Sequence, residues 1–169
     1  MAETPNSSAF NRNVQLLAKL IVTETDGLEK DSPNAPIAVG WTVVNRMKRN
    51  GTTHIDQAWH GYRHGKNATA TAIATAKGIL NGTIPDPSDG ATHFYTPNIM
   101  PKEGDDTDGC DVSGGLESVP GVVVKGDKIV KPVRNYRPGF AASFTEKAVF
   151  GVPPAVFKLY QQPGTGHVH

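Results

Sequence analysis

Near the start of the chain, apolar residues recur at steps of three and four, and the series ends on an acid. The apolar members are Val14, Leu17, Ala18 and Ile21, and Glu24 continues their stripe. This spacing is typical of an amphipathic helix that packs one face against a core. If Glu24 meets an apolar pocket, desolvation raises its pKa and keeps it protonated near neutral pH. If the helix instead ends at Asp26 and Gly27, Glu24 turns into solvent, and the helix by itself favours this second interpretation.

Length and composition suit one compact domain. The chain has 169 residues, of which 37% are hydrophobic, enough for a core of its own. We therefore expect a single domain over residues 1–169, with about 1–9 and 164–169 flexible at the ends. Cys110 is the only cysteine, so no internal disulfide forms and the fold depends on packing. The formal net charge of +1 gives no reason to expect a nucleic-acid partner.

Local patterns predict three helices followed by a region rich in turns. The helices are expected over about 10–26, from the capping segment 32–36 to about 49, and from 67 or 68 to 82. A short strand is expected within 91–96, a long polar loop over 98–118, and a hairpin over 119–133 around Gly126 and Asp127. The segment Ser143–Glu146 has capping-box spacing and predicts a last short helix. The expected fold class is therefore α+β and mainly helical.

Several blocks of the chain resemble a known family of enzymes. They are Leu17–Glu24, Ala38–Arg46, Ile79–Gly82 and Asp86–Pro97, in that order. Together they resemble the SleB-type cell wall hydrolases, which cleave peptidoglycan glycan strands on a lysozyme-like scaffold. The resemblance covers roughly residues 14–97, and Asp86–Pro97 is its most specific part. It implies a lysozyme-like domain in which Glu24 is the catalytic acid, which reverses the interpretation that the helix alone favours.

The chain departs from the family pattern in two places. Extra residues lie between Glu24 and Ala38, so the glutamate that follows the family's helix-ending glycine matches Glu29 only loosely. Beyond Pro97, residues 98–137 form a long insertion in the C-terminal half. We expect a small β-hairpin region there.

Cleavage of a glycosidic bond needs a protonated carboxyl at the bridging oxygen and a way to stabilise positive charge on the sugar ring. Glu24 suits the first role. A second carboxylate would serve the other, and Asp26, Glu29 and Asp31 are near in sequence; Glu29 is the candidate that we retain. Without a second acid, the substrate's own acetamido or 6-hydroxyl group can attack, and the latter gives a 1,6-anhydro product, as in lytic transglycosylases.

Aromatic residues with polar tips are the candidates for binding sugar rings. His93 and Tyr95 alternate on one face of the expected strand, and Trp59 and Tyr62 cluster before the third helix. Asn45, within the family-like block, completes the set of substrate-binding candidates. His60 and His64 are four residues apart, but two glycines and the lack of a third ligand argue against a metal. We predict neither a metal nor a cofactor.

The prediction is a muramidase that hydrolyses the β-1,4 bond between N-acetylmuramic acid and N-acetylglucosamine. Three alternatives stay open: a lytic transglycosylase, a non-catalytic glycan-binding module, and an amidase with Cys110 as nucleophile. Acidic residues surround Cys110 and disfavour the thiolate that a nucleophile needs.

The expected partner of the protein is the peptidoglycan glycan strand. Residues 1–8 are polar and acidic, unlike a secretory signal, and no segment approaches the ~20 apolar residues of a membrane span. We expect synthesis in the cytoplasm and delivery to the cell wall or periplasm by another machine, or a place within a larger protein. Any immunity or delivery protein is unknown.

Overall fold

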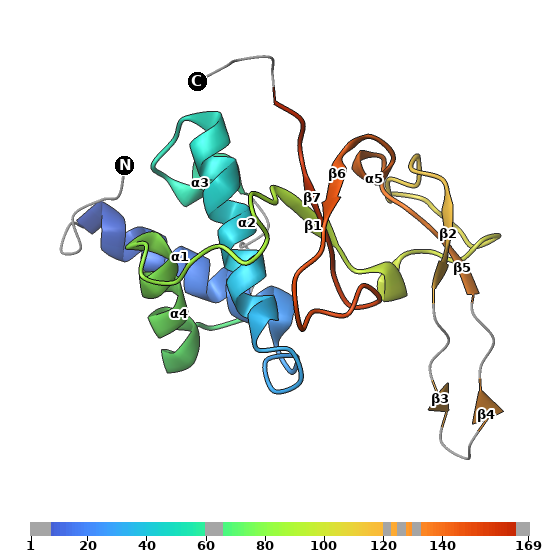
Figure 1. The fold of residues 1–169 in the computed structure, drawn as a ribbon, viewed down its shortest axis with the longest axis horizontal. Helices are drawn as coiled ribbons and strands as arrows, with labels where there is room; N and C mark the ends of the chain where they lie inside the picture. Colours follow the sequence, from blue (N-terminus) through green and yellow to red (C-terminus); the bar gives the residue numbers. More distant parts are fainter. Residues whose placement is uncertain (1–7, 60–65, 120–122, 125–127, 130–132, 165–169) are drawn as a thin grey trace. The chain divides into compact units, whose positions relative to one another are not determined.

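The computed structural model describes residues 8–59, 66–119, 123–124, 128–129 and 133–164. Within it the chain forms two compact units of mixed α and β structure (Figure 1). The first unit comprises the residues up to Thr92 and the segment Val149–Val152, and the second comprises His93–Ala148 and the residues from Pro153 onward. The α+β class expected from the sequence is confirmed.

The first unit consists of helices. They are α1 (Ser8–Thr25), α2 (Asn34–Asn50), α3 (Ile55–Ala58) and α4 (Ala70–Leu80). The three longer helices α1, α2 and α4 confirm the prediction from apolar periodicity, and each of them packs against the other two (Figure 1). Gly51 ends α2 in the left-handed conformation, with φ 69°, which glycine adopts without steric cost.

Close approach of helices creates the core of this unit. The fully buried side chains include Leu17, Leu20, Val39, Val43 and Ile79. Gly40 of α2 makes the approach possible, because a β-carbon there would lie 2.5 Å from Cδ1 of Ile79 and 3.2 Å from Cδ1 of Ile21. Trp41 is buried, and its Nε1 donates a hydrogen bond to the Ile84 carbonyl at 2.9 Å.

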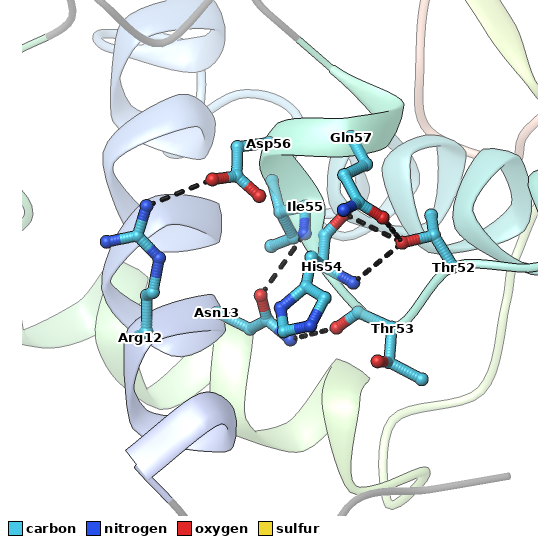
Figure 2. Close-up of polar contacts among 8 residues, drawn as sticks. All are labelled: Arg12, Asn13, Thr52, Thr53, His54, Ile55, Asp56 and Gln57. Atoms are coloured by element: carbon cyan, nitrogen blue, oxygen red, sulfur yellow. Dashed lines mark hydrogen bonds and ion pairs between the residues drawn. The ribbon is translucent and has the colours of Figure 1, made fainter.

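A buried amide joins α1 to the start of α3 (Figure 2). Asn13 Nδ2 donates to the Thr53 carbonyl at 2.6 Å, and Asn13 Oδ1 accepts from the Ile55 N–H at 3.2 Å. An exposed ion pair between Arg12 and Asp56, 3.0 Å long, lies on the same two helices. The amide of Asn13 therefore satisfies an N–H at the beginning of α3 that has no partner within the helix.

The second unit is built on a three-stranded antiparallel sheet. Its order is β1 (His93–Tyr95), β7 (Lys158–Gln161) and β6 (Thr145–Lys147). The same unit contains the short elements η1 (Pro97–Ile99) and α5 (Phe140–Ser143). The last helix predicted from Ser143–Glu146 is wrong, because Thr145–Lys147 pairs with Leu159–Gln161 as a strand. Hydrogen bonds to a distant strand prevail there over a local capping signal.

Residues 98–137 form strands as well as loops. The strand β2 (Leu116–Val119) pairs with β5 (Val133–Tyr136), and β3 (Val123–Val124) pairs with β4 (Lys128–Ile129), both antiparallel. The predicted hairpin is thus confirmed and extends further at both ends, although Gly126 and Asp127 lie outside the described residues. The polar loop predicted over 98–118 is wrong at its end, where β2 begins.

We find no helix among the described residues with the length and apolar character that crossing a bilayer requires.

Candidate functional site

Glu24 lies in the last turn of α1 and on the same helix face as Leu17, Leu20 and Ile21, all of which are buried. Its own side chain is partly buried. Burial raises the pKa of Glu24 above its usual value, because a carboxylate loses solvation there. Within the described part of the chain the Glu24 carboxyl makes no hydrogen bond and no ion pair. It is therefore a partly desolvated acid to which no described residue offers a compensating partner.

Lys66 contacts the end of α1 at Thr23 and at Asp26, one residue before and two residues after Glu24. Its backbone N–H donates to Thr23 Oγ1 at 2.9 Å, and its Nζ lies 2.6 Å from Asp26 Oδ2. Asp26, a carboxylate considered for the second catalytic role, is thus ion-paired and partly exposed. Glu29 is exposed and lies in the turn that follows α1.

Asn45 and Asp86 connect two of the family-like blocks. Asn45 Nδ2 donates to Asp86 Oδ2 at 2.8 Å and to the Ala91 carbonyl at 3.0 Å. Asp86 also accepts from the Ser88 N–H, the Ser88 hydroxyl and the Gly90 N–H, at 2.8, 2.7 and 2.9 Å. Burial would raise the pKa of Asp86, but the hydrogen bonds from Asn45 and Ser88 lower it below its usual value. The amide of Asn45 thus holds the 86–91 turn against α2.

Trp59 contacts a guanidinium group. The Arg46 Cζ atom lies 4.2 Å from the centroid of the Trp59 ring, and Arg46 Nε and Nη2 both donate to the Thr92 carbonyl, at 3.0 and 2.8 Å. Burial lowers the pKa of Arg46 to about 10. One face of Trp59 is therefore occupied by a cation. Tyr62, His60 and His64 lie outside the described residues.

His93 and Tyr95 belong to the second unit, and both rings contact Phe140 on one face of β1. Phe94 contacts Phe157 instead, as the predicted alternation requires. Tyr95 is buried, and its hydroxyl donates to Glu117 Oε2 at 2.5 Å. Burial and this hydrogen bond raise the pKa of Tyr95. The hydroxyl of Tyr95 is therefore engaged within the protein.

Glu117 connects the 98–137 segment to the three-stranded sheet of the same unit. Besides Tyr95, it binds Lys158 Nζ of β7 at 2.7 Å. The Glu117 side chain is 10% exposed and that of Lys158 is 23% exposed. Burial would lower the pKa of Lys158, but the Glu117 carboxylate raises it. This partly buried cluster is not predictable from the sequence, because Glu117 is a single acid within a polar stretch and carries no local signal.

Glu24 lines neither of two cavities that described residues of the first unit form. One has a volume of about 500 Å³ and is lined by Phe10, Asn13, Trp41, Val44, Met47, Lys48, Gly51, Thr52, Thr53, Ile79, Leu80 and Gly82. The other has a volume of about 420 Å³ and is lined by Ile21, Val22, Thr25, Asp26, Glu29, Pro33, Pro36, Ile37, Thr69, Thr71, Ala72 and Thr75. The smaller cavity begins in the last turn of α1, which also carries Glu24.

Cys110 is exposed and follows a turn in which its N–H donates to the Thr107 carbonyl at 3.1 Å. The neighbouring Asp111 carboxylate accepts hydrogen bonds from Ser113 and from the Gly139 N–H. Among the described residues no group of three or more His, Cys, Asp or Glu side chains is arranged to hold a metal ion.

Comparison of the chain with models of protein families, with curated proteins and with solved structures gives no match.

Proposed function

We propose that this protein is a lysozyme-like glycoside hydrolase that cleaves the β-1,4 bond between N-acetylmuramic acid and N-acetylglucosamine in peptidoglycan, with Glu24 as the general acid. The observation that carries the proposal is the state of Glu24, which is partly buried, has a raised pKa and lacks a hydrogen-bonding partner among the described residues. Burying a polar group without a partner costs free energy. Such a cost is typical of a residue that serves chemistry rather than folding.

The raised pKa suits the role. A general acid must hold its proton at the working pH and give it to the bridging oxygen as the glycosidic bond breaks. A carboxyl at its ordinary pKa would be almost fully ionised at neutral pH. Desolvation by burial is the cause of the raised pKa of Glu24, and it increases the protonated fraction of this carboxyl.

The second step of the reaction can follow two routes. A second carboxylate can activate water or attack the sugar, and Glu29, exposed in the turn after α1, is the candidate for this role. Asp26, which is nearer to Glu24 in sequence, is already paired with Lys66. If no second carboxylate takes part, the substrate's 6-hydroxyl group attacks the anomeric carbon instead and a 1,6-anhydro end forms, as in a lytic transglycosylase.

Digestion of purified peptidoglycan tests the proposal. We expect the wild type to release glycan fragments, and Glu24→Gln to lower the rate by about 10²–10⁴-fold, the usual contribution of a general acid. Glu103→Gln is the matched control, because Glu103 is an exposed acid of the second unit. Equal rates for wild type and Glu24→Gln would refute the assignment.

Mass analysis of the products separates the reaction types. New reducing ends indicate hydrolysis, whereas 1,6-anhydro ends indicate transglycosylation. Released peptides that disappear in Cys110→Ala would show an amidase instead. Binding to peptidoglycan without any product, unchanged in Glu24→Gln, would show a non-catalytic glycan-binding module.

A further inference from the structure

The smaller cavity of the first unit has a polar lining of unusual composition. Its polar members are four threonines and two acids: Thr25, Asp26, Glu29, Thr69, Thr71 and Thr75. They come from the end of α1, the turn after it and the beginning of α4. The remaining lining is aliphatic or proline. Hydroxyls and carboxylates over an apolar wall can bind a ligand that has both hydroxyl groups and apolar C–H faces.

Two of these threonines, the exposed Thr71 and the partly buried Thr75, have hydroxyls that bond to no described residue. Threonines within helices elsewhere in this unit donate to the carbonyl four residues earlier, as Thr23, Thr25 and Thr42 do at 2.6–2.8 Å. Thr71 and Thr75 make no hydrogen bond within the described part of the chain. They lie four residues apart on α4, and both line the cavity, so their hydroxyls present two donors and acceptors side by side.

The other polar groups complete the lining. Thr69 accepts a hydrogen bond from the Ala72 N–H at 3.1 Å as the N-cap of α4. The Thr25 hydroxyl donates to the Ile21 carbonyl, and its oxygen can still accept a hydrogen bond from a ligand. Glu29 is exposed at the rim, and a carboxylate there can accept from sugar hydroxyls or an amide N–H.

We propose that this cavity is a saccharide-binding subsite that takes an N-acetylhexosamine unit of a β-1,4 glycan, with Thr71 and Thr75 as its specific hydrogen-bonding residues. Its volume of about 420 Å³ lies in the usual range for small-molecule sites. The choice of an amino-sugar glycan rests on the proposed function. Glu24 is not part of the lining, whereas Glu29, the candidate second carboxylate, is, so the subsite borders the proposed reacting centre.

Titration calorimetry with chitotetraose tests the subsite. The parent protein carries Glu24→Gln so that the probe is not cleaved, and maltotetraose serves as a glycan without acetamido groups. We expect Thr71→Val with Thr75→Val to weaken chitotetraose binding by about tenfold, the effect of losing two ordinary hydrogen bonds. Thr71→Ser with Thr75→Ser keeps both hydroxyls and should bind like the parent. The control Thr145→Val, an exposed position in β6, should also leave binding unchanged.

Each outcome decides the question. A parent that does not bind chitotetraose, valine variants that bind it as tightly as the parent, or maltotetraose bound equally well, would overturn the subsite. Unfolding curves of the valine and serine variants establish that the fold is retained. Release of reducing ends by the protein with intact Glu24 is measured separately. Loss of binding in the valine variants without any cleavage by the wild type would leave the subsite standing and remove the proposed hydrolase activity.

Discussion

Asp86→Ala should destabilise the first unit strongly, because one carboxylate organises the whole 86–91 turn. Its oxygens accept four hydrogen bonds of 2.7–2.9 Å, from the Ser88 N–H and hydroxyl, the Gly90 N–H and the Asn45 amide. Ser88 is buried, with 2% of its surface exposed. Without the carboxylate, its N–H and its hydroxyl would therefore have neither their acceptor nor water to bond to. A hydrogen bond to a charged group contributes about 1.5–3 kcal/mol, so the loss of the two bonds from Ser88 alone should cost about 3–6 kcal/mol of unfolding free energy.

The lower half of that range, about 3–4 kcal/mol, is the expected value because neighbouring interactions are not additive and water can reach Asn45 and Gly90. Urea unfolding followed by tryptophan fluorescence measures it. Trp41 is a suitable reporter, since its indole N–H bonds to the Ile84 carbonyl just before the turn. Asp108→Ala, which removes an exposed acid in the second unit, should change stability by less than about 0.5 kcal/mol.

The pH dependence provides a second test of the same reasoning. Because the pKa of Asp86 is lowered in the folded state, its stabilisation is fully present above the ordinary carboxyl pKa of about 3.9 and is lost as the pH falls through the lower folded value. The difference between wild type and Asp86→Ala should therefore be largest at neutral pH and shrink in acid. A cost below about 1 kcal/mol at pH 7, or a difference that grows in acid, would refute the role assigned to this carboxylate.

Three further perturbations follow from the structure. Glu24→Gln should stabilise the protein at pH 7. Because the folded state raises the pKa of Glu24, the protonated side chain is tolerated below the unfolded pKa, and stability is lost as the pH rises through the folded pKa and the carboxyl ionises. Thermal unfolding should therefore show a gain for the variant at pH 7 and none near pH 4. Glu117→Ala removes the acceptor of Tyr95 and Lys158 and should cost about 2–4 kcal/mol in urea unfolding, whereas a cost near zero would contradict the cluster. Gly40→Ala places a methyl group 2.5 Å from an isoleucine side chain and should cost about 1–3 kcal/mol by overpacking, measured in the same way, whereas a gain in stability would show that the helices can separate freely.

The long helices could be predicted from the sequence because their signals are local. Residues three and four apart share a helix face, so α1, α2 and α4 follow from the order of apolar residues. The strands β6 and β7 depend on each other across the chain, with Thr145 opposite Gln161 and Lys147 opposite Leu159. A local capping pattern at Ser143–Glu146 gave the wrong helix because it contains no information about that pairing.

Only part of the candidate site could be predicted from local sequence patterns. The position of Glu24 on an apolar stripe is a local pattern, and the structure shows the stripe buried and the acid partly buried. The hydrogen bond from Asn45 to Asp86 spans 41 residues of sequence, and the contact of Glu117 with Tyr95 spans 22. No spacing rule in the sequence predicts either pair, so the contacts that Asn45 and Glu117 make within the protein cannot be found without the structure.

These long-range contacts also bear on what the family-like blocks mean. Asn45 and Arg46 of one block bind Asp86, Ala91 and Thr92 of the next, so much of the resemblance can be accounted for by the requirement to hold one turn against one helix. Such residues carry little information about the reaction, because the fold needs them in any case. Glu24 is different: it is partly buried, and no described residue bonds to its carboxyl. Glu24 is therefore the acid of these blocks on which a catalytic role depends, because no contact among the described residues gives it a structural one.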